Sequence, residues 1–396
     1  MRATLSLVAA ALCATSASAC TTIIVGKDAS ADGSVMCTHS DDGESNSDAR
    51  IVRVPGVPHI APGAKRDVFW DTEGYPRHVG DKRGVEEYFV ANNPGQDPSV
   101  VIGTIPEANA TFTYFEANYG IMNENSVGFG ESTCSAVFGT NSVAHGGKAL
   151  LSIDSLSRIA MERATSSKHA VRIMGALAEQ YGFYGAGSFE GSAESLMVID
   201  PTEGWIFQIL PDNTGASAVW AAARVPDDKV GIVANMFTIR GLNLTDSANF
   251  MASASAHTIA VAQGWWKPSD GLMDFTAVYS DGEYAHKFYS GRRMWGGYRI
   301  LAPSVVLPDN YTDLRFDTIY PTFIKPDKKL TVADLLEVHR TFYQGTKYDM
   351  TQGVAAGPFG NPDRFKTQGI TKVGGAWERS IGLFRTTQAH VLQARR

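Results

Sequence analysis

The order of expected strands and helices limits the fold of this chain more than any other feature. Two amphipathic helices are expected in succession, at residues 153–164 and 170–181, where apolar residues recur at the helical period. Residues 195–210 predict a β-hairpin, because two apolar runs are joined by the turn sequence Asp-Pro-Thr-Glu-Gly. In this order, strands are followed by two successive helices and then by more strands, whereas βαβ units alternate strand and helix. The sequence therefore predicts an α+β fold built in layers.

Other segments complete this pattern. Near the N-terminus, residues 21–38 predict a hairpin, since two apolar runs flank the turn-rich Ala31-Asp32-Gly33. We find no low-complexity linker and no internal repeat, and we therefore expect residues 20–396 to form one domain. The remaining expected elements are a strand pair over 119–131, strands at 219–225 and 230–235, and a helix over 332–343 with Thr331 as its N-cap.

Residues 1–19 have the layout of a secretory signal peptide. Arg2 supplies a positive n-region, residues 5–12 an apolar h-region, and Ala17-Ser18-Ala19 an A-x-A cleavage site. The apolar run is shorter than the ~20 residues that span a bilayer. We expect export, either to the extracellular space or along the secretory or lysosomal route.

Charge and motifs exclude several classes of function. The net charge is −6 and no long Lys/Arg run occurs, which argues against nucleic acid or a stably bound membrane as partner. The chain lacks H-E-x-x-H, G-x-S-x-G and phosphate-loop signatures, and its histidines and cysteines do not take zinc-site spacing. We therefore expect no metal or organic cofactor.

The cysteine count points to one special thiol. Cys13 leaves with the signal peptide, so Cys20, Cys37 and Cys134 remain, an odd number for an oxidising compartment. A bridge between Cys37 and Cys134 stays open, because sequence does not supply the Cα separation that a disulfide requires. At least one thiol is expected to be free.

Cys20 becomes the first residue when the chain is cut after Ala19. Its α-amine, with a pKa near ~8, can accept the proton of its own thiol, so nucleophile and base lie on one residue. Two alternatives remain open, a lipid-anchored cysteine and a structural one. Ala17 stands where a lipoprotein normally carries a large apolar residue, and a β-branched strand rather than a polar tether follows Cys20. These observations favour the nucleophile.

Motifs along nearly the whole mature chain resemble the secreted dipeptidase family of cysteine-type N-terminal nucleophile (Ntn) hydrolases, the PepD-like enzymes with secernins as relatives. The resemblance implies a four-layer αββα sandwich with the cysteine at the end of a central strand. It also implies hydrolysis of dipeptides. The matching segments are "CTTIIVGKDASADGSVMCTHSDDG" (20–43), "VFWDTEGYPRHVG" (68–80), "YGIMNENSVGFGESTC" (119–134), 158–185, "VGIVANMFTIRGLNL" (230–244), "GRRMW" (291–295), 320–340 and "RTTQAH" (385–390).

Around the nucleophile, the resemblance assigns roles in the first motif. Cys20 matches the family nucleophile and its α-amine the base. Asp42 matches the acid that orients the amine, with Asp41 as the alternative aligned residue. His39 stands where many relatives carry an arginine; it can hydrogen-bond there without being permanently charged.

Three later residues also match active-site positions. Asn123 and Asn235 match asparagines that line the oxyanion hole, where a side-chain N–H stabilises developing negative charge. For Asn123 the alternative is a cap of an Asx-type turn. Arg293 matches an arginine near the nucleophile, with Arg292 as its exposed neighbour and a solvated pair as the alternative.

The expected function is secreted, cysteine-type hydrolysis of dipeptide peptide bonds. An acylase acting on the same machinery, a non-enzymatic secernin-like role and a lipoprotein are the alternatives. The chain departs from the family after "QAHVLQARR", where relatives usually continue with further strands, so the sandwich is expected to be incomplete at its C-terminus. Substrate side-chain preference and oligomeric state are not determined by the sequence.

Overall fold

The computed structural model describes residues 20–43, 48–70, 79–83, 100–185, 192–281, 289–309, 320–364 and 378–395. The expected signal peptide, residues 1–19, lies outside these ranges. Among the described residues, no helix has the length and apolar character needed to cross a membrane.

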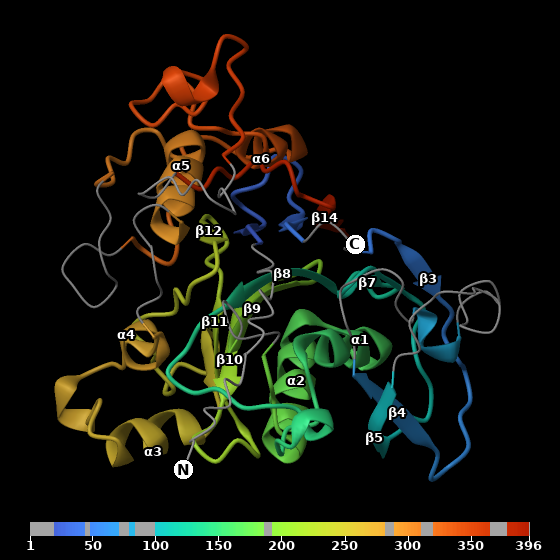
Figure 1. The fold of residues 1–396 in the computed structure, drawn as a ribbon. Helices are drawn as coiled ribbons and strands as arrows, with labels where there is room; N and C mark the ends of the chain where they lie inside the picture. The colour runs from blue at the N-terminus through green and yellow to red at the C-terminus, as the bar shows by residue number, and fades with distance from the viewer. Residues whose placement is uncertain are drawn as a thin grey trace, which may run out of the picture.

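The described strands form two large antiparallel sheets and a separate hairpin (Figure 1). One sheet has four strands in the order β12-β1-β2-β14, and the other has eight in the order β13-β11-β10-β9-β8-β7-β6-β3. The hairpin is β4-β5. The strands are β1 (Thr22–Val25), β2 (Val35–Asp41), β3 (Val52–Val54), β4 (Lys65–Trp70), β5 (Val100–Pro106), β6 (Tyr114–Glu116), β7 (Gly120–Asn123), β8 (Gly128–Cys134), β9 (Ala193–Ile199), β10 (Gly204–Pro211), β11 (Ala218–Arg224), β12 (Val230–Val233), β13 (Phe250–Ala252) and β14 (Gln388–Ala394).

The α-helices are α1 (Ile153–Arg163), α2 (Ser167–Tyr181), α3 (Ser255–Ala262), α4 (Phe275–Tyr279), α5 (Ser290–Leu301) and α6 (Val332–His339). Helices α1 and α2 were expected, and each begins at a serine whose side chain accepts a hydrogen bond from a backbone N–H of its first turn. Helix α6 is shorter than the expected 332–343. It ends at His339, and Tyr343 then takes a left-handed backbone conformation (φ 63°) that no α-helix can contain.

Three apolar cores hold the layers together. Helices α1 and α2 pack on the eight-stranded sheet, and helices α5 and α6 pack near the four-stranded sheet, which faces the larger one (Figure 1). Alternation along β1 shows the arrangement, since Ile24 enters the core between the sheets while Ile23 and Val25 enter the core with α5 and α6. The observed structure is thus a layered mixture of helices and antiparallel sheets, in agreement with the α+β prediction.

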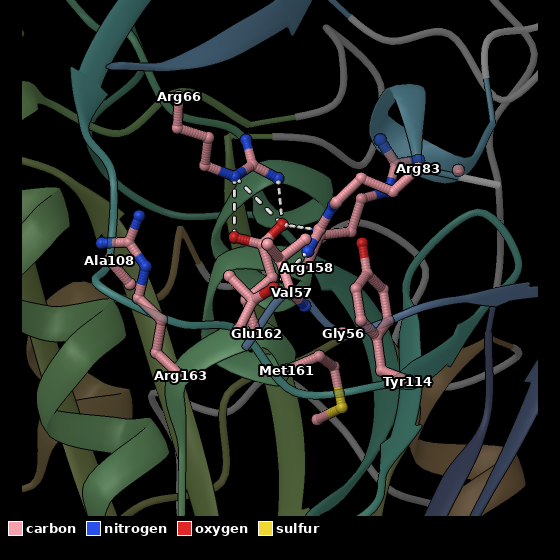
Figure 2. Close-up of polar contacts among 12 residues, drawn as sticks. Gly56, Val57, Arg66, Arg83, Ala108, Tyr114, Arg158, Met161, Glu162 and Arg163 are labelled. Carbon is pink, nitrogen blue, oxygen red and sulfur yellow. Dashed lines mark hydrogen bonds and ion pairs between the residues drawn. The ribbon is translucent and has the colours of Figure 1, made fainter. Parts of the chain in front are cut away.

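A buried ion-pair cluster attaches the β4-β5 hairpin to α1 (Figure 2). The Glu162 carboxylate of α1 accepts hydrogen bonds from Arg66 Nε at 2.9 Å and from the Arg83 guanidinium. Arg83 also donates to the Thr111 hydroxyl at 2.7 Å. Glu162 is buried, so loss of its arginine partners would leave an uncompensated charge inside the protein. The ion pairs therefore hold the hairpin and the segment of Arg83 against α1.

The two sheets approach each other closely at Gly130 of β8. A Cβ atom there would lie 2.1 Å from the carbonyl oxygen of Thr38 and 2.8 Å from Oγ1 of Thr22. Thr22 Oγ1 itself donates to that carbonyl at 2.7 Å, so neither group can move aside without breaking a buried hydrogen bond. Only glycine allows this approach, which lies one residue from the site described below.

Gly130→Ala should therefore lower the free energy of unfolding by about 3 kcal/mol, because its methyl group meets backbone. Gly128→Ala, on the same strand, is the matched control. Its methyl group meets the side-chain ends of Leu392 and Met122 at 2.9 and 3.1 Å, which can shift, so a loss of about 1 kcal/mol is expected. Chemical denaturation of both variants measures the difference, and equal losses would contradict the close-approach argument.

Candidate active site

Cys20 lies directly before β1, an inner strand of the four-stranded sheet, and it is fully buried and not part of a disulfide. Residue Thr21 bridges to Ser40 at the end of β2. The carbonyl oxygen of Cys20 accepts a hydrogen bond from Arg293 Nη1 at 2.7 Å and one from Ser132 Oγ at 3.4 Å. Groups from β2, β8 and α5 therefore converge on this residue.

The thiol lies against two buried side chains, His39 of β2 and Glu131 of β8. One ligand-type atom from each of Cys20, His39 and Glu131 can be chosen so that all three lie within 4.8 Å of one another. His39 Nε2 and Glu131 Oε2 form an ion pair at 3.3 Å, and Thr133 Oγ1 donates to the other Glu131 oxygen at 2.9 Å. Sequence reasoning did not identify Glu131, because the complete burial of its strand is visible only in the folded structure.

The electrostatics of this pocket raise the pKa of the Cys20 thiol and the pKa of the His39 imidazole. Burial raises the pKa of the Cys20 thiol well above its usual range, the carboxylates of Glu131 and Asp41 raise it further, and a hydrogen bond with the Asp42 backbone lowers it. Burial alone would lower the pKa of His39, but contact with the Glu131 carboxylate raises it above its ordinary value. His39 can therefore supply positive charge where many relatives are expected to carry an arginine.

The two candidate acids, Asp41 and Asp42, have different partners. Asp42 forms an ion pair with Arg379 Nη2 at 2.5 Å and accepts a hydrogen bond from the Thr386 hydroxyl. Asp41 accepts a hydrogen bond from Asn118 Nδ2 at 2.8 Å, while its buried Oδ1 has no hydrogen-bond partner in the described part of the chain. Arg379, which sequence reasoning missed, thus compensates the charge of Asp42, and Asp41 keeps an oxygen that can receive a cationic group.

Arg293 and Asn235 meet at Cys20. Arg293 Nη1 also donates to Thr21 Oγ1 at 3.0 Å, and its Nη2 donates to Asn235 Oδ1 at 2.6 Å. Asn235 follows β12 in a left-handed conformation (φ 57°), which asparagine tolerates better than most residues, and its Nδ2 donates to Thr133 O at 2.7 Å. The structure therefore brings both residues to the candidate nucleophile.

Arg292 points elsewhere. Its Nε contacts the Glu378 carboxylate at 2.5 Å, and its guanidinium stacks over the ring of Tyr348 at 3.3 Å from the ring centroid. Both arginines are buried, so the alternative of a solvated pair is wrong. Of the two, Arg293 contacts Cys20.

Asn123 lies at the end of α1 rather than among these groups. Its Nδ2 donates to the carbonyl oxygens of Met161 and Ala164 at 3.0 and 2.9 Å. Its Oδ1 accepts from the backbone N–H groups of Asn125 and Val127 at 3.0 and 3.1 Å. These four bonds correspond to the turn-cap alternative, and we do not include Asn123 in the proposed mechanism.

Cys37 and Cys134 are both buried and form no disulfide, so the bridge that the sequence left open is not present in the structure. Cys37 packs in the core between the sheets, and Cys134 Sγ lies 3.2 Å from Ser195 Oγ. Of the three cysteines in the described part of the chain, none forms a disulfide, and Cys20 is the one grouped with His39 and Glu131.

Asn123→Ala should destabilise the protein without changing its chemistry. Loss of the amide leaves buried carbonyl and N–H groups unpaired, which predicts a loss of about 3 kcal/mol in unfolding free energy. Asn125→Ala is the control, because its side chain makes only a 3.4 Å contact with Ala164 O, and about 1 kcal/mol or less is expected. A fall of about 10²-fold or more in kcat per folded Asn123→Ala molecule would instead restore the oxyanion assignment.

Comparisons with known proteins address the same question from sequence. The model of peptidase family C69 matches residues 19–396. A "Probable dipeptidase" of Salmonella dublin is 27% identical over 392 residues, which cover 95% of this chain and 74% of that protein. A "Probable dipeptidase" of Latilactobacillus sakei is 25% identical, with 96% and 68% covered, and "Dipeptidase A" of Lactobacillus helveticus is 24% identical, with 95% and 69% covered. Because the family match extends over nearly the whole chain, this protein belongs to peptidase family C69.

Proposed function

We propose that this chain is a cysteine-type dipeptidase whose nucleophile is Cys20, exposed as the first residue when residues 1–19 are removed during export. Membership of a peptidase family and relatives named dipeptidases support hydrolysis of a peptide bond. The observation that carries the cysteine mechanism is the Cys20 thiol beside the His39–Glu131 pair, with Arg293 on the carbonyl of the same residue. The layer order supports assignment to the four-layer αββα sandwich of Ntn hydrolases.

The state of the thiol defines the first step. Because its pKa is raised, the resting sulfur holds its proton, and attack requires a base within reach. The α-amine of Cys20, attached to the same Cα, accepts that proton as the sulfur attacks the substrate carbonyl carbon. Asp41 favours the resulting ammonium through its negative charge, whereas the charge of Asp42 is compensated by Arg379.

The later steps return the proton and release the products. We assign oxyanion stabilisation to the Asn235 amide, which Arg293 holds beside the nucleophile. The ammonium of Cys20 protonates the leaving amine as the C–N bond breaks, which leaves an acyl thioester on the sulfur. Water then attacks the thioester with the amine again as base, and the carboxylic acid product and the thiol are released.

The charge of the pocket favours a dipeptide over an acyl amide. In a dipeptide the α-ammonium is attached to the carbon next to the attacked carbonyl, so it lies close to the sulfur. Asp41 presents a buried oxygen without a hydrogen-bond partner in the described region, and Glu131 adds a second carboxylate near the thiol. Glu131 is already paired with His39, but an apolar acyl group would leave the Asp41 carboxylate without a cationic partner. We therefore propose small dipeptides with free amino termini as the substrate class.

Removal of the thiol or burial of the α-amine in a peptide bond should each abolish turnover. Cys20→Ser and a chain that retains Ala19 before Cys20 should both lose dipeptide hydrolysis by several orders of magnitude, while Cys37→Ala stays active. N-terminal sequencing of the exported protein should begin Cys-Thr-Thr. A lipidated or uncleaved N-terminus, or unchanged turnover in Cys20→Ser, would overturn the mechanism and favour the lipoprotein or secernin-like alternative.

Acetylation of the substrate amino group should separate dipeptidase from acylase. We expect N-acetyl dipeptides to react poorly, and Asp41→Asn to lower kcat/KM for free dipeptides by about 10- to 100-fold with little effect on the acetylated ones. Asp32→Asn is the control, because it removes one charge from an acid paired with Arg395 at a partly exposed position. Equal turnover of free and acetylated substrates would favour the acylase.

A further inference from the structure

We propose that the pocket of Cys20 binds one divalent ion of the zinc type through Cys20 Sγ, His39 Nε2 and a Glu131 carboxylate oxygen, and that the bound ion reversibly blocks the nucleophile. The three side chains that would bind the ion are already close together in the folded chain, so this part of the inference does not depend on the proposed function. Only the blocking effect, and the fourth donor described below, rest on the proposed function.

The spacing of the three donors suits a small tetrahedral ion. Zinc lies about 2.0–2.3 Å from nitrogen, oxygen and sulfur ligands, so neighbouring ligands in a tetrahedral site are about 3.3–3.8 Å apart. His39 Nε2 and Glu131 Oε2 are already 3.3 Å apart, and all three donors lie within 4.8 Å of one another. Because 4.8 Å is the upper limit of these separations, a movement of at most about 1.5 Å, within reach of side-chain rotation, brings the three donors to tetrahedral spacing.

The Glu131 carboxylate is already oriented for such an ion. Its Oε1 is held by Thr133 Oγ1 at 2.9 Å, which leaves Oε2 facing His39. Hydrogen bonds of this kind to a ligating carboxylate fix its direction and raise metal affinity. The three donor residues are buried, with exposed fractions of 0%, 2% and 1% for Cys20, His39 and Glu131, so water competes little for the ion.

The donor types select the class of metal. A thiolate, an imidazole and one carboxylate favour zinc and chemically similar ions such as cobalt, whereas calcium and magnesium require sites made mainly of oxygen. Binding displaces the protons of the thiol and of the imidazolium. The charges of a thiolate, a carboxylate and a divalent ion then cancel inside the pocket.

The mature N-terminus adds a fourth donor. The α-amine and the thiolate of one cysteine can bind the same ion in a five-membered chelate ring, which makes a four-coordinate site of two nitrogens, one sulfur and one oxygen. In that state the nucleophile and its base are both bound to metal. The ion is thus an inhibitor that chelation removes, rather than a cofactor of the reaction.

Cobalt titration of the chain that begins at Cys20 tests this site, because Co²⁺ reports a bound thiolate by its charge-transfer absorption. We expect one Co²⁺ per chain, loss of the charge-transfer band in Cys20→Ser, and at least about 10- to 100-fold weaker binding in His39→Asn and Glu131→Gln. Cys37→Ala is the matched control and should keep the band, since Cys37 packs in the apolar core between the sheets. Circular dichroism checks that each variant is folded.

Two results overturn the inference, namely a band that persists in folded Cys20→Ser and the absence of stoichiometric Co²⁺ binding by the folded wild type. Dipeptide hydrolysis is measured separately, with the metal removed by a chelator. Active enzyme without Co²⁺ binding refutes the metal site alone, and Co²⁺ binding without hydrolysis refutes the proposed function alone. The full chain, whose Cys20 nitrogen is an amide, should bind Co²⁺ more weakly than the chain that begins at Cys20, and equal affinity refutes the fourth donor.

Discussion

The buried guanidinium of Arg293 is the interaction on which the arrangement at Cys20 depends. It comes from α5, donates to the carbonyl of Cys20 ahead of β1, and donates to Asn235 beyond β12. Three segments distant in sequence are thereby held at one point. Five N–H donors in a rigid plane suit this task, and lysine could not replace them. Since the guanidinium is fully buried, each donor needs its acceptor, and the position of Cys20 follows from that requirement.

Charge in the pocket is negative around the sulfur and positive behind it. The carboxylates of Glu131, Asp41 and Asp42 act on the thiol, with His39 paired to Glu131, whereas Arg293 binds the Cys20 carbonyl and Arg379 is paired with Asp42. A pocket of this kind disfavours a free thiolate and favours cations near it. The raised pKa of the thiol, the proposed preference for a substrate ammonium and the proposed binding of a divalent ion therefore have the same physical origin.

Sequence reasoning anticipated the parts of this site that depend on local pattern or on family motifs. The β1-β2 hairpin, helices α1 and α2, and the residues Cys20, Asn235 and Arg293 all lie where such signals placed them. Asn123 was ambiguous, because an asparagine before a turn gives the same sequence signal whether it caps a helix end or faces a substrate. Its contacts with α1 are formed across 38 and 41 residues of sequence, which no local pattern reports.

Glu131 and Arg379 required the tertiary structure. Glu131 becomes informative only when β8 of one sheet faces β2 of the other, which brings its carboxylate to His39. Arg379 reaches Asp42 across 337 residues. Both are charged side chains whose burial is tolerable only with a partner, and the identity of that partner is a property of sheet packing rather than of sequence spacing.

Removal of residues 1–19 would change the chemistry of Cys20 in two linked ways. Before the cut its nitrogen is an amide, which neither accepts a proton at neutral pH nor binds a metal ion well. After the cut the same atom is an amine that can serve as catalytic base or as metal ligand. Because both roles use one lone pair, they exclude each other, and a metal ion can hold the processed protein inactive until a chelator or a stronger binding site removes it. Export would then create the base, and the metal content of the destination would determine whether it is used.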